Sequence, residues 1–532
     1  QSVAIGNEAL LVQNPSGNVD MDNVAVGYRA GYAVTTGTGN IAIGSGALDA
    51  NTTASNNTAI GQGALGACTT GTSNVAVGYQ AGDALTTGTQ LTALGYNAGG
   101  AITTGVFNTA LGYEALLTED TESYNTAVGA YAMRVADGAG YTTCVGYNAG
   151  AAITTGDYNV LVGSHAGDAI TTSPNNVAVG YLALSAHTTG SGQNVAIGTS
   201  AAAALTTGLD CTYVGYLAGT TTTTPTGNTG IGSAALRYAT TGEYNTAVGY
   251  AAGRDTTTGS ENTFIGSSAG VANTTASYNT AVGHTALDAN TTGADNVAVG
   301  RNALGANTTA SNNTALGTNA LGANTTGTYN TAVGSQAGAA IAGDGNYNTL
   351  VGAIAGDAIT TGDDNTAVGR GALSACTTSS FNNAFGSVAL EVLTTGNYNC
   401  AFGYKAAGAM TTGPANNAFG HQALDVATTG QHNNAFGADA LGACTTGSYN
   451  IAVGGDALGA MTTASNNVAV GDDSLKATTT GANNTAVGIR TLDANTTGGS
   501  NTALGADALG TATTANNNTA VGQSALLATT TG

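Results

Sequence analysis

The feature that most constrains the fold of this chain is one phrase of seventeen residues, repeated from end to end. Residues Asn279–Asp295 have the sequence N-T-A-V-G-H-T-A-L-D-A-N-T-T-G-A-D, and Asn296 begins the same phrase again. The glycine that follows Val, Ile, Leu or Phe, here called the anchor glycine, recurs 31 times from Gly6 to Gly522. Nearly every step has this same length, and only three steps are slightly longer. A fixed short period over a whole chain is typical of a solenoid built from stacked coils.

The residues before the anchor glycine predict a short strand in every coil. Position −1, directly before the anchor, is apolar in all 31 coils, and position −2 is Ala in 25 of them. Such a β-branched segment, closed by glycine, is too short for a stable helix. We therefore expect position −1 to form the core column. Representative members are Val77, Val248, Val282, Val299 and Val333.

The remaining positions complete the predicted coil. Position +3 is Ala in 29 of 31 coils, which predicts a second short strand or a bend with close packing. Thr-Thr-Gly segments further on predict a corner. The sequence thus predicts an all-β fold, a parallel β-solenoid or β-roll of about 31 coils. We expect one continuous array over residues 1–532, with a longer first connection at residues 7–26.

Asn and Gly form two further columns with a predicted structural role. Asn stands four residues before the anchor in 27 of 31 coils. It tolerates the left-handed conformation of a tight corner, and stacked Asn amides can bond from coil to coil as a ladder. Representatives of the Asn column are Asn74, Asn245, Asn279, Asn296 and Asn330. Their anchor glycines are Gly78, Gly249, Gly283, Gly300 and Gly334.

Charge and hydropathy exclude several classes of function. The formal net charge is −21, and the chain has only nine Lys and Arg residues, so no basic surface for nucleic acid or anionic lipid is expected. No apolar run is long enough for a transmembrane helix, so no membrane span is predicted. The chain begins at Gln1 and ends at Gly532 within a repeat, and we expect a processed chain or part of a longer protein.

Catalytic and metal chemistry are not predicted, and neither is a cofactor. Gly266–Gly270 matches G-x-S-x-G and Gly61–Gly66 matches G-x-G-x-x-G, but both are ordinary instances of the repeat. No two of the six cysteines are separated by one repeat, so we expect small apolar fillers and no disulfide framework. The five histidines are scattered over different positions of the coil, which indicates no metal cluster. The chain is therefore not predicted to be an enzyme.

Several segments resemble a known family of repeats. S-V-A-I-G at Ser2–Gly6, N-V-A-V-G at Asn74–Gly78 and N-V-A-I-G at Asn194–Gly198 resemble the head repeats of trimeric autotransporter adhesins of the YadA-like type. Similar repeats occur in phage tail-fibre and other surface-fibre proteins. The resemblance covers practically the whole chain, although the adhesin repeat is shorter and lacks the Thr-Thr-Gly segment. It implies a left-handed β-roll, assembly as a homotrimer, and a place at a cell or virion surface.

Three functions follow from these observations. The first is a non-enzymatic structural or adhesive shaft of an extracellular fibre, which associates with itself as a homotrimer or as an end-to-end polymer. The second is a fibre that binds a cell-surface glycan or receptor, because Tyr recurs directly after the anchor and directly before the Asn. The third is ice binding, because adjacent Thr residues recur as columns at the strand spacing of ~4.8 Å.

Overall fold

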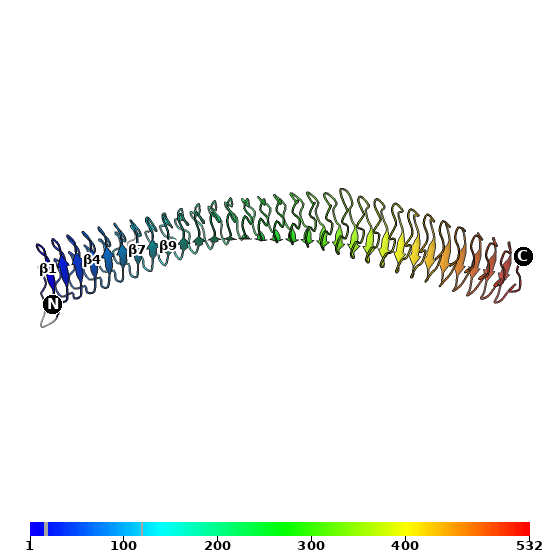
Figure 1. The fold of residues 1–532 in the computed structure, drawn as a ribbon, viewed down its shortest axis with the longest axis horizontal. Helices are drawn as coiled ribbons and strands as arrows, with labels where there is room; N and C mark the ends of the chain where they lie inside the picture. The colour runs from blue at the N-terminus through cyan, green and yellow to red at the C-terminus, as the bar shows by residue number, and fades with distance from the viewer. Residues whose placement is uncertain (15–19, 119–120, 532) are drawn as a thin grey trace. The chain divides into compact units, whose positions relative to one another are not determined.

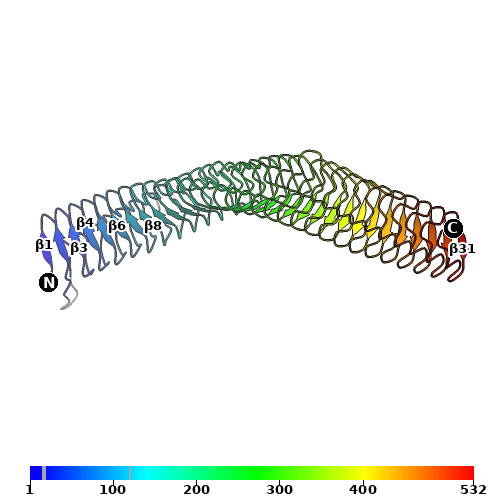
Figure 2. The same cartoon turned by 45° about the vertical axis from the view of Figure 1, so that its right-hand side comes forward.

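The computed structural model describes residues 1–14, 20–118 and 121–531, and it contains two compact units, Gln1–Asn262 and Thr263–Gly532. Each unit is a parallel β-solenoid in which every coil contributes one strand of three residues and a returning loop (Figure 1, Figure 2). No helix occurs in the described ranges. The predicted all-β solenoid and its seventeen-residue period are confirmed. The predicted first connection, 7–26, includes residues 15–19, which lie outside the described residues.

The strands of the first unit are β1 (Val3–Ile5), β2 (Val24–Val26), β3 (Ile41–Ile43), β4 (Thr58–Ile60), β5 (Val75–Val77), β6 (Thr92–Leu94), β7 (Thr109–Leu111), β8 (Thr126–Val128), β9 (Thr143–Val145), β10 (Val160–Val162), β11 (Val177–Val179), β12 (Val195–Ile197), β13 (Thr212–Val214), β14 (Thr229–Ile231) and β15 (Thr246–Val248). The strands of the second unit are β16 (Thr263–Ile265), β17 (Thr280–Val282), β18 (Val297–Val299), β19 (Thr314–Leu316), β20 (Thr331–Val333), β21 (Thr349–Val351), β22 (Thr366–Val368), β23 (Asn383–Phe385), β24 (Cys400–Phe402), β25 (Asn417–Phe419), β26 (Asn434–Phe436), β27 (Ile451–Val453), β28 (Val468–Val470), β29 (Thr485–Val487), β30 (Thr502–Leu504) and β31 (Thr519–Val521).

Consecutive strands within each unit pair in parallel, with equivalent residues opposite one another. In β17 and β18, for example, Ala281 is the partner of Ala298. The longer steps of the repeat leave this register intact, since Val3 pairs with Val24 across the longest step. Extra residues are therefore accommodated in the loops, and the strand column runs on without a slip.

The inside and outside of the strands are the reverse of the sequence prediction. The middle residue of the strand, position −2, is buried in all strands but β1, whereas position −1 points outward and is only half-buried or exposed. The predicted core column was therefore wrong for Val77, Val248, Val282, Val299 and Val333, none of which is buried. The physical reason is the narrow coil. The interior has room for a small residue such as Ala at position −2. Because side chains alternate along a strand, the larger β-branched residues at positions −3 and −1 then point outward.

The large side chains in the core of the coils come from three positions, and a coil holds at most two of them in most of the stack. Position +4 supplies Leu in many coils, such as Leu304 and Leu373, and position +7 then carries a smaller or polar residue, Asn307 or Cys376. Where position +4 is Gly, a larger residue fills the space from position +7 or from position −2. A Cβ on Gly356 would meet the side chains of Leu350 and Ile359 at 2.7 and 2.8 Å. A large residue at one core position is thus often accompanied by a small residue at another.

The segment after the anchor glycine is a turn, so the predicted bend is confirmed and a second strand is not formed. Positions +2 and +4 adopt left-handed backbone conformations, for example Asn302 at φ 56° and Leu304 at φ 50°. A left-handed conformation costs Leu ~1 kcal/mol or more. Two contacts offset this cost: the Leu304 side chain is fully buried, and its N–H donates to the carbonyl of Ala320 in the next coil at 3.0 Å.

The Asn column forms a buried ladder from coil to coil, as predicted. The backbone N–H of Asn296 donates to Oδ1 of Asn279 at 3.0 Å, and Nδ2 of Asn296 donates to the same oxygen at 3.2 Å. Nδ2 of Asn296 also donates to the carbonyl of Ala310 at 2.8 Å. The backbone N–H of Asn330 likewise donates to Asn313 Oδ1 at 2.9 Å. One detail of the prediction was wrong, since the left-handed residue is the one before the Asn, such as Asp295 at φ 57°.

The anchor glycine is required by its backbone conformation and by its neighbour. Its φ lies between 131° and 144° at the five representative positions, a region that L-residues rarely adopt. A Cβ on Gly283 would also meet the carbonyl oxygen of Gly300 at 2.6 Å, and backbone cannot move aside as a flexible side chain can. The glycine column therefore allows the coils to stack at the strand spacing.

The exchange of large residues between positions +4 and +7, here called the volume rule, makes a prediction for the coil of Leu373. Leu373→Gly removes the large side chain of its coil, and we expect it to lower the free energy of unfolding by about 2–4 kcal/mol, even though Gly relieves the left-handed strain. The double variant Leu373→Gly with Cys376→Ile reproduces the Gly356 and Ile359 pair of the preceding coil and should recover most of this loss. Urea unfolding of the full chain measures both. A double variant no more stable than the single one would contradict the rule.

Candidate functional site

The outward residues of the strands form one face of each unit, here called the strand face, in which an unbroken apolar column at position −1 runs beside a column of mainly Thr and Val at position −3. It consists of positions −3 and −1, which carry Thr, Val, Ile, Leu or Phe in most coils. Its most exposed apolar members away from the chain ends include Ile41, Ile43, Ile60, Val75, Leu94, Val297, Leu316, Phe436, Ile451, Val453 and Leu504, which are 37–47% exposed. Sequence reasoning placed position −1 inside and so missed this surface. Exposed apolar columns of this kind make the strand face a candidate interaction surface.

Four consecutive phenylalanines extend the strand face in the second unit. The rings of Phe385, Phe402, Phe419 and Phe436 stack in sequence with centroids 4.4–4.9 Å apart and interplanar angles of 8–9°. Stacking of neighbouring rings is favourable in itself. It also leaves a flat row of rings on the outside of β23 to β26, beside a mainly polar column of Asn383, Cys400, Asn417 and Asn434 at position −3.

Tyrosines form two exposed columns that flank the strands. Tyr79, Tyr96 and Tyr113, directly after the anchor, stack with centroids 5.1–5.2 Å apart at 9°. A second run, directly before the Asn position, comprises Phe107, Tyr124, Tyr141 and Tyr158, with centroids 4.9–5.3 Å apart. Because each ring covers the face of its neighbour, these runs present ring edges to solvent.

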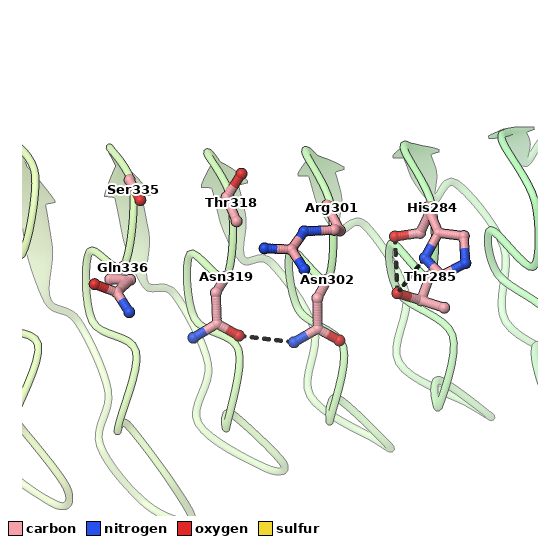
Figure 3. A pocket seen from close by; sticks show the side chains of 8 residues that line it. All are labelled: His284, Thr285, Arg301, Asn302, Thr318, Asn319, Ser335 and Gln336. Carbon is pink, nitrogen blue, oxygen red and sulfur yellow. Dashed lines mark hydrogen bonds between the residues drawn. The ribbon is translucent and has the colours of Figure 1, made fainter.

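A polar groove occupies the second unit where the first of these columns lacks Tyr. It has a volume of about 610 Å³ and is lined by positions +1 and +2 of four consecutive coils (Figure 3). Position +1 contributes His284, Arg301, Thr318 and Ser335. Position +2 contributes Thr285, Asn302, Asn319 and Gln336. No sequence motif indicated this groove, because Tyr is absent from position +1 in nearly all coils of the second unit and its absence does not single out these four.

The groove side chains are held by local hydrogen bonds. Nδ2 of Asn302 donates to Oδ1 of Asn319 at 2.7 Å, which joins adjacent coils (Figure 3). The Thr285 hydroxyl donates to the carbonyl of His284 at 2.8 Å, and its oxygen lies 3.3 Å from His284 Nδ1. Asn302, Asn319 and Thr285 all have left-handed backbone conformations. The side chains of position +2 therefore project in a row along the coil stack.

Several Asp residues at position +5 are half-buried beside the turn. Partial burial raises the pKa of Asp83, Asp288, Asp357 and Asp493 above the usual value, because a less hydrated site disfavours the charged form. Backbone hydrogen bonds, and His284 in the case of Asp288, oppose this shift. Within the described parts of the chain, no group of three or more His, Cys, Asp or Glu residues could hold a metal ion.

The cysteines are free thiols in the core or at its edge. Cys68, Cys376 and Cys444 occupy position +7 and are fully buried, as expected for small apolar fillers. Burial raises the pKa of Cys68 and of Cys444 to about 11. A thiol in such surroundings is inert, since the thiolate is the reactive form.

The six N-T-T sequons have buried asparagines. Asn273, Asn290, Asn307, Asn324 and Asn495 at position +7, together with Asn51, are fully buried. Asn290 Nδ2 donates to the carbonyl of Gly293 at 2.9 Å and to Asn273 Oδ1 at 3.0 Å. These amides form a second, shorter ladder in the interior, and folding withdraws them from glycosylation.

The catalytic-looking strings lie in turns. Gly266–Gly270 follows β16 and Gly61–Gly66 follows β4, and each forms the ordinary turn of its coil. The G-x-S-x-G and G-x-G-x-x-G motifs require a helix after the turn, and no helix occurs in residues 1–14, 20–118 and 121–531. These segments therefore lack the structural context of either motif.

His187 is the one histidine in the core of the described chain. It occupies position +7 between coils that carry Ile170 and Leu205, and its Nε2 lies 2.8 Å from the Ser173 hydroxyl. Nδ1 is buried and has no hydrogen-bond partner among the described residues. Burial lowers the pKa of His187 to about 4, because the charged form is poorly solvated there.

This shift predicts a pH-dependent stability. The pKa of His187 is lower in the folded chain than the ordinary value of 6.5, so the full stability is present above pH 6.5 and is lost as pH falls through 4. The maximum loss is about 3 kcal/mol. His187→Leu, which copies Leu205 of the next coil, should reduce the difference in urea stability between pH 7 and pH 4. An unchanged difference would show that His187 does not titrate with unfolding.

Comparison with known proteins adds no relative. No protein-family model matches the chain, and no curated protein matches it. No helix in the described residues has the length and apolar character needed to cross a membrane. The function is therefore inferred from the strand face, the aromatic columns and the groove.

Proposed function

We propose that this protein is a non-enzymatic structural and adhesive shaft of an extracellular fibre, at a cell surface or virion surface, assembled as a homotrimer through its strand faces. The observation that carries the proposal is the unbroken apolar column at position −1 of the strand face, with side chains such as Leu94 and Leu316 at 45% and 46% exposure. Isolated exposed apolar residues are ordinary, but an unbroken column of them marks an interaction surface.

The size of the strand face supports association. Fifteen strands in the first unit, at ~4.8 Å spacing and a width of roughly 10 Å, offer on the order of 700 Å². Stable protein interfaces bury about 800 Å² per partner. The strand face of a single unit is thus already close to the size that a stable interface needs.

The regular spacing of the strand face favours a second copy of the same chain as the partner. In a parallel arrangement, columns of identical side chains at the coil spacing meet in register along the whole stack, as the coils themselves do. The resemblance to trimeric adhesin heads favours three chains. The repeat architecture supports a shaft, since each added coil extends the stack by one strand spacing and contacts only its neighbours.

The Thr pairs do not favour ice binding as a second function. The Thr at position +8 is half-buried and donates its hydroxyl to the carbonyl of the equivalent Thr in the next coil, as Thr291 does to Thr308 at 3.0 Å. Only the second Thr, such as Thr292, is exposed. Only the Thr column at position +9 is therefore exposed to solvent, because the hydroxyls of the column at position +8 bond to the next coil.

The assembly proposal predicts a clear effect of charge on the strand face. Val297→Lys with Leu316→Lys places two cations on adjacent strands, opposite the same residues of a symmetric partner, and should weaken association at least tenfold. The matched control, Thr292→Lys with Thr309→Lys, adds the same charge at exposed corner positions and should assemble as the parent does.

Analytical ultracentrifugation of the parent chain and the two variants measures the assembly state. A parent mass of three chains, lost in the strand-face variant and kept in the control, is the expected result. A monomeric parent would refute the proposal, and so would equal assembly of both variants. Open-ended polymers in place of trimers would show end-to-end association instead.

A further inference from the structure

We propose that the groove of the second unit binds an acidic oligosaccharide, with a sugar carboxylate held by Arg301 and hydroxyls held by the row of amides beside it. The groove lies within one chain, on coils β17 to β20, and contains no member of the strand face. The inference therefore does not depend on how the chain assembles.

The charge of the groove differs from that of the rest of the molecule. The chain carries a net charge of −21, and several of its nine cations pair with carboxylates, as Arg134 does with Glu114 at 2.9 Å and Lys476 does with Asp473 at 2.7 Å. Arg301 is exposed and forms no ion pair among the described residues. Its guanidinium can accept a carboxylate in the bidentate geometry that Arg favours.

The residues at position +5 of the neighbouring coils explain why no carboxylate of the described chain pairs with Arg301. Position +5 carries Asp288 in the coil of His284, and these two side chains interact electrostatically. The same position carries Gly305 and Gly322 in the next two coils. No lining residue of the groove is acidic, so the Arg301 end presents a cation without an adjacent competing carboxylate.

The remaining lining fits hydroxyl groups. The Asn302 and Asn319 amides share one hydrogen bond, and each amide has further donor and acceptor sites that this bond does not use. Gln336 continues the row in the next coil (Figure 3). Successive amides stand about one strand spacing apart, ~4.8 Å, which is comparable to the length of one pyranose unit in a linear glycan. A linear oligosaccharide along the stack can therefore meet one amide per sugar.

The chemistry excludes other ligand classes. The lining has no Val, Leu, Ile or Phe and no Tyr or Trp, so an apolar ligand gains nothing there. A polyanion with a charge on every unit meets a single guanidinium on a strongly acidic protein and is repelled. A glycan with few carboxylates and many hydroxyls is neither apolar nor densely charged, so it fits this lining.

The experiment is calorimetric titration of the full chain with a linear octasaccharide of neutral hexoses that carries a single glucuronate. Its carboxyl-reduced form and free glucuronate are titrated in parallel. We expect saturable binding of the octasaccharide and at least tenfold weaker binding of both comparison ligands. If free glucuronate binds as tightly as the octasaccharide, the groove recognises only the carboxylate and the other sugars contribute nothing. That result would overturn the glycan assignment.

Two variants locate the site. Arg301→Gln should weaken octasaccharide binding at least tenfold. Arg370→Gln, the matched control, removes an exposed arginine from the same position of a coil outside the groove and should bind as the parent does. Asn319→Asp places a carboxylate in the groove and should abolish binding. No saturable binding by the parent chain, or equal losses in Arg301→Gln and Arg370→Gln, would refute the proposal. Sedimentation of Arg301→Gln checks assembly separately, so that failure of the shaft proposal remains distinguishable.

Discussion

The hydrogen bond between an Asn amide oxygen and the backbone N–H of the next coil is the interaction on which the rest of the structure depends. It lies in a dry interior, where an unpaired backbone N–H is costly, and it recurs through most of both units. The same side chain reaches a carbonyl at the opposite corner, as Asn296 does to Ala310. Each Asn therefore ties its own coil to the preceding coil and closes its own loop.

The narrow interior explains much of the sequence variation around this ladder. Large side chains enter the core from three positions, and the position that supplies them changes from one coil to the next. Phe264 at position −2 is accompanied by Gly270 at position +4, where a Cβ would meet the Phe264 ring, whereas Gly230 at position −2 is accompanied by Leu236. In these coils a large residue at one position faces a glycine at the other, so the two do not overlap.

The period, the three-residue strands, the Asn ladder and the need for the anchor glycine could all be predicted from the sequence, because each is a local property repeated in register. The inward face of the strand could not be predicted from hydrophobicity, since Ala and Val are both apolar. A signal existed nonetheless: bulky residues at position −2, such as Leu161 and Tyr213, occur with Gly at position +4, as Gly167 and Gly219 show. The groove is formed by polar residues at positions +1 and +2 of four consecutive coils, which no motif records.

The central claim is that the Asn amide holds neighbouring coils together. Asn313→Ala tests it most directly, because it removes the amide oxygen and the smaller Ala side chain fits within the space that Asn313 occupies. The measurement is hydrogen exchange at the backbone amide of Asn330, which donates to Asn313 Oδ1 in the parent chain. We expect this amide to exchange at least tenfold faster in the variant, while exchange in coils several repeats away is unchanged. Equal protection of Asn330 in the parent chain and the variant would contradict the account.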